Sequence, residues 1–362
     1  MSDRPVNFNP GPAILPLSVL EKASRAVLAL DGVGLSVLEI SHRSKEFEAI
    51  NADAMARVKR LFQVPDTHDV LFLQGGASGQ FAQIPLNFLG KDQVGAYVLS
   101  GAWSKKALEE AKRLGNAVSI ASSEAQNFCE LPSLDGVAVP ANAAYVHTTS
   151  NNTIYGTQWP TLPEFPGQRH VCDMSSDIFS RPVDGGKFAL IYAGAQKNAG
   201  PSGVTIVIVE KAWMASAPKT IPTIWRYQTH ADNQSLYNTP PTLGVYLVGL
   251  TLAWIEEQGG LAAIEKANEA KAKVLYDAID GSNGFYRGSV TNRAHRSRMN
   301  VTFLLPSEEL EKKFLKEADA LKLVGLKGHR SVGGLRASIY NAMPLAGVEK
   351  LVGLMERFRK AN

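Results

Sequence analysis

The feature that most constrains the fold is an alternation of apolar segments, glycine or polar turns, and helical segments that begins near residue 69. Apolar runs bounded by turn residues predict buried strands, and longer amphipathic runs predict helices. Strands are predicted at 70–73, 96–100, 137–139 and 144–148, with another near Val118, and helices at 80–89 and 105–114. The alternation predicts an α/β fold in which helices flank a mostly parallel central sheet, with a ligand site along the carboxyl ends of the strands.

One lysine lies between two further predicted strands, at 188–194 and 204–209, in a loop of small residues. Lys197 has little solvated surface around it, and desolvation lowers the pKa of an amine and makes it competent to form a Schiff base. Asp173 ends another short predicted strand, 169–173. A pyridoxal phosphate enzyme needs such a pair, because the lysine holds the aldehyde and the carboxylate keeps the pyridine nitrogen protonated. A surface hairpin lysine and a strand-capping aspartate are the alternative.

Other polar or aromatic residues lie at predicted strand ends. The glycine-rich segment 74–79 precedes a helix, whose free amide groups and dipole favour a phosphate, although many such turns bind nothing. Trp103 follows the strand at 96–100, where its ring stacks on a flat ligand or packs into the core. Thr153 lies in the polar loop 149–156. Together with Asp173, these positions favour a single site.

The chain divides into three predicted parts: an N-terminal arm at 1–15, a large domain at 16–257 and a smaller C-terminal α+β domain at 258–362. Helices are expected at 16–30, 45–62, 243–257, 261–279, 307–321 and 345–360, and strands at 299–305 and 335–340. Residues 225–241, rich in Thr, Asn, Gln and Pro, are predicted to form an ordered loop.

Positive charge gathers between glycines in the segment 327–336. Solvated loop charge explains His329 and Arg330, but Arg336 opens an apolar strand, where an arginine generally needs a carboxylate or a phosphate. His42 and Arg43 precede a helix and are either ordinary polar residues at its start or ligands of an anion.

Composition excludes several classes of function. The 362 residues carry a net charge of only +4 with acids and bases interspersed, which argues against nucleic-acid binding. The longest apolar run, 243–255, is too short to span a bilayer, and the N-terminus lacks a signal peptide. Cys129 and Cys172 make no metal-ligand spacing. A cytoplasmic protein without a metal site or membrane segment is therefore expected.

The motifs occur in one order that is similar to a known family. They are Asn9-Pro-Gly-Pro12, Ser41-His-Arg43-Ser, Gly75-Gly-Ala-Ser-Gly-Gln80-Phe, Gly101-Ala-Trp103-Ser, Ala195-Gln-Lys197-Asn, Asn238-Thr239-Pro-Pro and Gly328-His-Arg330-Ser. The chain resembles the phosphoserine aminotransferases, which belong to the class V, fold-type I aminotransferases. The similarity runs from about residue 5 to the C-terminus.

The resemblance implies pyridoxal 5'-phosphate bound covalently to Lys197, with Asp173 against the pyridine nitrogen, Trp103 stacked on the ring and Thr153 near its hydroxyl. Ala77, Ser78 and Gln196 are expected to hold the cofactor phosphate, together with Asn238 and Thr239 from the other subunit of a homodimer with shared active sites. Some family members carry arginine where this chain has Ser78, so here backbone amides and a hydroxyl are expected to carry more of the phosphate binding.

The implied reaction transfers the amino group of glutamate to 3-phosphohydroxypyruvate, giving O-phospho-L-serine and 2-oxoglutarate in serine biosynthesis. The family places His42, Arg43, His329 and Arg330 around the substrate phosphate and Arg336 on the α-carboxylate. Use of phosphohydroxythreonine, in pyridoxal phosphate biosynthesis, stays open. The alternatives are another class V enzyme, such as an alanine-type aminotransferase or a cysteine desulfurase, and a non-catalytic phosphate-binding protein on the same scaffold.

Overall fold

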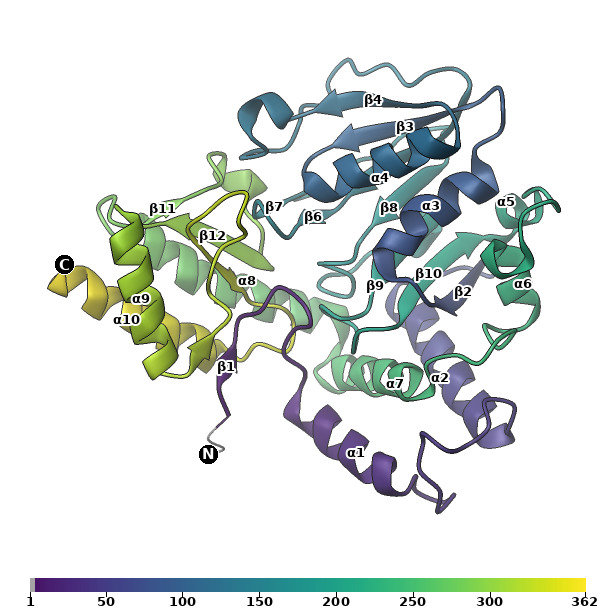
Figure 1. The fold of residues 1–362 in the computed structure, drawn as a ribbon, viewed down its shortest axis with the longest axis horizontal. Coiled ribbons are helices and arrows are strands. Elements are labelled where there is room, and N and C mark those ends of the chain that lie inside the picture. The colour runs from purple at the N-terminus through teal and green to yellow at the C-terminus, as the bar shows by residue number, and fades with distance from the viewer. Residues whose placement is uncertain (1–3) are drawn as a thin grey trace.

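A seven-stranded sheet forms the centre of the computed structural model, which describes residues 4–362 (Figure 1). Strand β10 runs antiparallel to both of its neighbours, whereas the other neighbouring strands are parallel. The mostly parallel sheet that the sequence predicts is therefore confirmed. In order across the sheet the strands are β2 (His68–Leu73), β10 (Thr205–Glu210), β9 (Leu190–Gly194), β8 (His170–Asp173), β5 (Ala143–Thr149), β3 (Val94–Leu99) and β4 (Ala117–Ser122).

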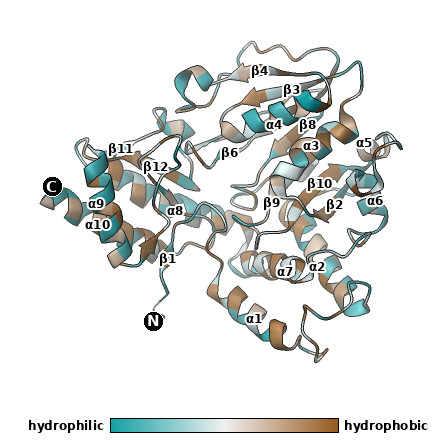
Figure 2. Cartoon of the chain, viewed as in Figure 1, coloured by the Kyte–Doolittle hydropathy of each residue, from teal (hydrophilic) through white to brown (hydrophobic). Residues whose placement is uncertain are grey.

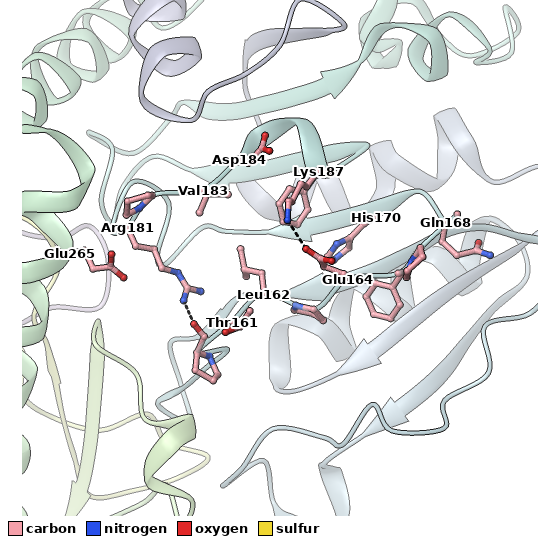
Figure 3. A pocket seen from close by; sticks show the side chains of 17 residues that line it. Thr161, Leu162, Glu164, Gln168, His170, Arg181, Val183, Asp184, Lys187 and Glu265 are labelled. Carbon is pink, nitrogen blue, oxygen red and sulfur yellow. Dashed lines mark hydrogen bonds and ion pairs between the residues drawn. The ribbon is translucent and has the colours of Figure 1, made fainter.

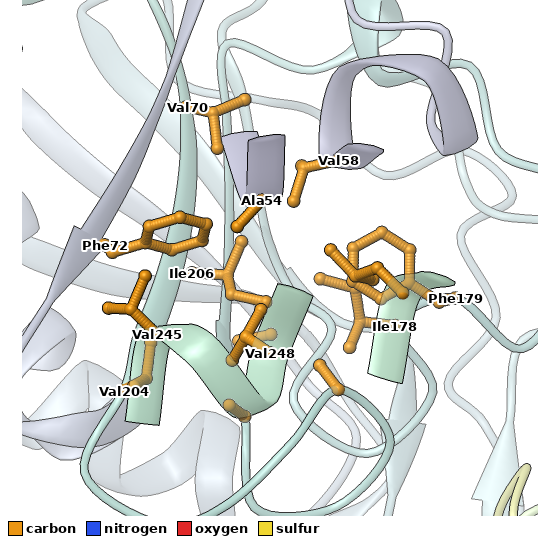
Figure 4. Packing of buried hydrophobic residues seen from close by; sticks show 14 of the residues in the cluster. Ala54, Val58, Val70, Phe72, Ile178, Phe179, Val204, Ile206, Val245 and Val248 are labelled. Atoms are coloured by element: carbon orange, nitrogen blue, oxygen red, sulfur yellow. The ribbon is translucent and has the colours of Figure 1, made fainter. Parts of the chain in front are cut away.

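Helices cover both faces of this sheet, because successive side chains of each strand point to opposite faces and both faces are apolar. Along β2, Val70 and Phe72 pack on one face among side chains of α2 and α7 (Figure 4). Leu71 and Leu73 point to the other face, into a cluster that includes residues of α3 and α4. Full burial of such side chains contributes about 1.5–3 kcal/mol each. The helices are α1 (Leu17–Leu28), α2 (Lys45–Leu61), α3 (Gly76–Phe88), α4 (Ala102–Leu114) and α7 (Thr242–Glu257).

Hydropathy follows the same layers. The strands β2, β3 and β10 are drawn mainly in hydrophobic brown, whereas helix α4 carries both colours (Figure 2). In α4 the buried residues Ala107, Leu108 and Ala111 face the sheet and the lysines and glutamates of the helix face outward. Within residues 4–362, none of the helices combines the length and hydropathy that crossing a membrane requires.

The C-terminal part has a separate apolar core. There β11 (Arg287–Gly288), β12 (Asn300–Leu304) and β14 (Leu335–Ser338) form a three-stranded antiparallel sheet. Its buried side chains, including those of β12 and β14, pack with α8 (Gly260–Asp280), α9 (Glu308–Ala320) and α10 (Leu345–Ala361). Helix α8 contributes to both cores: Leu261 and Ile264 belong to the large one, and Leu275 and Ile279 to the smaller.

The N-terminal arm joins the two parts. Strand β1 (Val6–Asn7) pairs in parallel with β13 (Leu323–Val324), and the fully buried Phe8 lies in the C-terminal core. Further along, the Ala13 amide donates to the Gln196 carbonyl at 2.9 Å, next to the predicted catalytic lysine. The first three residues of the predicted arm lie outside the described residues.

Several local predictions were wrong. Residues 137–139 form no strand, because a turn at Gly136 and the proline at 140 leave only three residues between them; Val139 packs against a small cluster instead. The expected loop 225–241 contains helix α6 (Tyr227–Asp232).

The remaining short elements are α5 (Lys211–Ala215), β6 (Asn151–Asn152), β7 (Thr157–Gln158) and 3₁₀ turns at Glu124–Gln126, Gly185–Lys187, Thr223–Trp225 and Arg293–His295.

Candidate active site

A cavity of about 430 Å³ opens at the carboxyl ends of β5, β8 and β9. The N-termini of α3 and α4 border it, and so does the turn between Pro10 and Gly11 of the arm. The cavity brings together nine of the residues singled out from the sequence: Ala77, Ser78, Trp103, Thr153, Asp173, Gln196, Lys197, His329 and Arg336.

Lys197 follows β9, and its amine donates to the Thr153 hydroxyl at 2.8 Å. Burial lowers the pKa of this amine to about 8, and the negative charge of Asp173 opposes the shift without cancelling it. An amine with that pKa is substantially neutral under mildly alkaline conditions. The structure therefore presents a nucleophilic amine at the floor of a cavity.

Asp173 ends β8 as the sequence predicted. Its Oδ1 atom accepts hydrogen bonds from the Ser175 amide at 2.9 Å and the Ser175 hydroxyl at 2.6 Å. Burial raises the pKa of the carboxyl, and the bonds from Ser175 oppose that shift. Within residues 4–362 no cation forms an ion pair with Asp173. A buried carboxylate of this kind is suited to a cationic ligand group in the cavity.

The glycine-rich turn differs from its prediction in one respect: α3 begins at Gly76 rather than at residue 80. Gly75 adopts φ +96°, a left-handed conformation that favours glycine, and turns the chain directly into the helix. Ala77 and Ser78 consequently lie in the first helical turn, where amide groups lack partners within the helix. No acidic residue lies in this turn. The helix start is therefore available to an anion.

Trp103 also lies in the first turn of a helix, because α4 begins at Ala102 and not at residue 105. The centroid of its ring lies 5.9 Å from the Lys197 amine nitrogen, so the ring borders the space in front of that amine. Its indole nitrogen is buried and has no hydrogen-bond partner among the described residues. A flat ligand attached to Lys197 would lie against this ring.

Arg336 reaches the cavity from β14 and links the C-terminal part to the lysine. Its Nη1 atom donates to the Thr153 carbonyl at 3.1 Å, while its Nε atom has no partner among the described residues. Burial lowers the pKa of the guanidinium, and no carboxylate within residues 4–362 forms an ion pair with it. An arginine left in this state is a binding group for a ligand carboxylate or phosphate.

Five predicted residues do not line this cavity. Arg330 is exposed beside His329, and His42 is partly buried with an unpartnered Nε2 atom. Arg43 lines a separate surface hollow together with Glu48 and Tyr237. Asn238 donates to the Gln74 side-chain oxygen at 3.2 Å, and Gln74 donates to the Thr239 carbonyl at 3.4 Å. These last two residues therefore contact the chain just before Gly75 without entering the cavity.

Ser175 and Gly11 contribute to the site although the sequence predictions gave neither of them a role there. Ser175 anchors Asp173, and the small polar residues after that strand were its only signal. Gly11 packs so closely that an added Cβ atom would lie 3.3 Å from the Lys197 Cγ atom, at φ +139°. Nothing in the local pattern of the arm indicates this contact, because the two residues are far apart in the chain.

A larger cavity of about 650 Å³ lies elsewhere, between residues 160–168 and 181–188 (Figure 3). Several of its charged groups already have partners: Lys187 pairs with Glu164 at 2.7 Å, Arg181 donates to the Pro160 carbonyl at 2.7 Å, and Glu265 pairs with Arg298 at 2.8 Å. None of the predicted site residues lines it. No group of His, Cys, Asp or Glu within residues 4–362 is arranged to hold a metal ion. The smaller cavity around Lys197 is therefore the candidate active site.

Comparison with known proteins gives a consistent result. Residues 6–351 match the model of the family described as aminotransferase class-V. The chain is 56% identical over 352 residues to a phosphoserine aminotransferase of Herpetosiphon aurantiacus, covering 97% of this chain and 98% of that protein. It is 51% identical over 360 residues to the phosphoserine aminotransferase of Bacillus subtilis, covering 99% of both.

Solved structures agree with this. The phosphoserine aminotransferase of Bacillus circulans subsp. alkalophilus superimposes with a TM-score of 0.97 at 53% identity, covering 99% of each chain. A phosphoserine aminotransferase from Trichomonas vaginalis, solved with bound pyridoxal phosphate, gives a TM-score of 0.93 at 39% identity and covers 98% of this chain and 100% of that one.

Proposed function

The chain belongs to the phosphoserine aminotransferase family of the class-V aminotransferases, and on that basis we propose that it transfers the amino group of glutamate to 3-phosphohydroxypyruvate at the Lys197 cavity. It is a pyridoxal phosphate-dependent aminotransferase. The observation that best supports the assignment of the site is the pairing of a buried amine, Lys197, with a buried carboxylate, Asp173, in a cavity bordered by a helix N-terminus.

The cavity residues fit pyridoxal phosphate chemically. Asp173 is a buried carboxyl group that forms no ion pair with a cation of the described residues, which suits a protonated pyridine nitrogen. The start of α3, at Ala77 and Ser78, suits a phosphate, and Gln196 lines the cavity beside the lysine. Trp103 offers an aromatic ring to a flat ligand. When bound, the cofactor supplies an electrophilic aldehyde and an electron-withdrawing ring, which make the α-hydrogen of an amino acid acidic.

The roles of the protein side chains follow from their positions. The Lys197 amine would remove the proton from the α-carbon of glutamate and later return one to the α-carbon of the product. Asp173 holds a proton at the pyridine nitrogen. Thr153 orients the lysine through its hydroxyl. Arg336 binds the substrate α-carboxylate, which directs the α-carbon toward Lys197.

Absorbance spectroscopy of the purified protein tests this function. We expect the visible absorbance of the bound cofactor to bleach when glutamate is added and to return with 3-phosphohydroxypyruvate but not with pyruvate. A band that pyruvate restores equally well would favour an alanine-type aminotransferase of the same class. A protein that binds no cofactor and shows no band would favour a non-catalytic role.

We also propose that the active protein is a homodimer with shared sites. Arg43 and Tyr237 line one surface hollow, and the neighbouring Asn238 contacts Gln74 at the edge of the candidate site. Large apolar side chains are exposed in the same regions of the chain, namely Leu35, Leu38, Ile224, Trp225 and Tyr237. A partner subunit that covers these side chains would also bring His42, Arg43, Asn238 or Thr239 to a site that they do not reach within their own subunit.

Mixed dimers test the shared site directly. A dimer of one Lys197→Ala subunit and one Arg43→Ala subunit has, if Arg43 acts across the interface, one complete site and one doubly defective site. We expect co-expressed and doubly tagged mixed dimers to regain roughly half of wild-type activity, although each homodimer is severely impaired. Unmixed homodimers combined just before the assay serve as the control. Activity in the mixed dimer that only equals the average of the two homodimers would contradict the shared site.

We further propose boundaries for the domains of the chain and a cytoplasmic location for the protein. The proposed division into an arm at 1–15, a large domain at 16–257 and a small domain at 258–362 is supported by the two separate cores, although helix α8 serves both. The proposed cytoplasmic location is supported by Cys129 and Cys172, which are free thiols.

A further inference from the structure

Lys106, on the second turn of α4, has no role in the mechanism described above. Its amine nitrogen lies 4.7 Å from the centroid of the Trp103 ring, the same ring that borders the cavity. It forms no ion pair with any carboxylate in residues 4–362. Its neighbour Lys105 is different, because that amine pairs with Glu124 at 2.6 Å. The ammonium of Lys106 is therefore an exposed cation without a carboxylate partner in residues 4–362, next to a ring that lines the candidate active site.

Other cations gather at the same rim. His329 lines the same cavity as Trp103, and burial, followed by the positive charges of Arg336, Arg330 and Lys106, lowers the pKa of its imidazole. Neither Arg330 nor Arg336 forms an ion pair with a carboxylate of the described chain. Mutually repelling cations without a counterion disfavour the empty state and favour a multivalent anion. The protein as a whole carries a net charge of only +4, so this concentration of charge is local.

The cations occupy different ends of the site. Arg336 acts on Lys197 itself, because its charge contributes to the lowered pKa of that amine, and it contacts Thr153. It therefore lies at the end where bonds to the substrate α-carbon change. Lys106 instead lies over Trp103 and acts on His329. A cation–π contact at an exposed position is weak, and the flexible lysine stem allows the ammonium to leave the ring for a stronger anionic partner.

We propose that Lys106 is a specificity-determining residue, whose ammonium contacts the distal phosphate of the substrate beside His329. This inference rests on the proposed function, because it assigns part of the preference for a phosphorylated oxo acid. The chemistry that Lys106 recognises is a phosphate dianion on the carbon opposite the α-carboxylate. A single carboxylate at that position, as in glutamate, carries less charge and gains less from the contact.

The test compares Lys106→Met with Lys105→Met, a matched control on the same helix. Lys106→Met is expected to raise the KM for 3-phosphohydroxypyruvate about tenfold, as loss of an exposed charge-assisted contact predicts, with kcat changed by less than about threefold. The KM for glutamate should change less. Lys106→Arg should retain the wild-type KM within about threefold, since it keeps the charge. Lys105→Met should match the wild type.

A binding measurement separates recognition from turnover. Inorganic phosphate serves as a competitive probe, and its inhibition constant should rise in Lys106→Met but not in Lys105→Met. The visible absorbance of the bound cofactor should be the same in all variants. Equal kinetics and equal phosphate inhibition in the two methionine variants would overturn this inference alone. A wild-type protein that uses pyruvate as well as 3-phosphohydroxypyruvate would instead overturn the proposed function.

Discussion

Replacement of Lys197 by alanine is expected to lower turnover by roughly 10⁴-fold or more, because in the proposed mechanism one side chain supplies both the covalent anchor and the proton-transferring amine. The structure explains the sensitivity: no other lysine lines the cavity among the described residues. Steady-state assays at saturating substrates would measure the loss. Lys197→Arg is the informative companion, since it keeps a positive charge but has no neutral amine near pH 8, and we expect it to be equally inactive.

The pH dependence of cofactor capture gives a second measurement on the same residue. Because burial lowers the pKa of the Lys197 amine to about 8, the neutral fraction rises as the pH passes through that value. Capture of pyridoxal phosphate by the cofactor-free protein should therefore accelerate between about pH 7 and 9 and level off above pH 9.

An exogenous primary amine should restore part of the activity of Lys197→Ala. Turnover by the alanine variant close to that of the wild type would contradict the assignment.

Replacement of Asp173 by alanine is expected to leave weak cofactor binding and slow turnover. Removal of one partner from a buried charge pair costs on the order of 3–5 kcal/mol, which corresponds to a loss of roughly 10² to 10⁴-fold in rate. The carboxylate is buried and receives two hydrogen bonds from Ser175, and no other acidic side chain of the described residues lines the cavity to replace it. Cofactor affinity by absorbance titration and turnover by steady-state assay measure the two effects separately.

Asp173→Asn refines the test, because it keeps the size of the side chain and an acceptor for Ser175 but removes the charge. We expect its turnover to fall about as far as that of the alanine variant, since the charge at the pyridine nitrogen is what the reaction requires. Asp66→Asn, at an exposed position, is the matched control and should behave like the wild type. Unchanged turnover in Asp173→Asn would show that the charge has no catalytic role.

The alternation of strands and helices was predictable because hydrophobic periodicity is a local property. Asp173 at a strand end and Lys197 between two buried strands lie where their neighbours in the chain imply. Helix starts were less predictable, because the small residues around Ala77 and the tryptophan at 103 have no strong helical pattern. Gly75, at φ +96°, turns the chain into α3 before Ala77, and α4 begins at Ala102, three residues earlier than its pattern predicts. The apolar triplet at 137–139 forms no strand because the turn at Gly136 and the proline at 140 limit it to three residues.

Sequence alone therefore determined the layers of this protein and singled out Lys197 and Asp173 as the proposed catalytic pair, because apolar periodicity and the chemistry of single side chains can be recognised in short stretches of sequence. Only the tertiary structure decided which distant segments share the cavity: Gly11 against Lys197, Arg336 on the Thr153 carbonyl, and Lys106 over the ring that borders the site. Periodicity predicts which face of an element is buried. Periodicity does not predict which loops meet at the edge of the sheet. Those contacts form only when the arm and the C-terminal core pack against the large sheet.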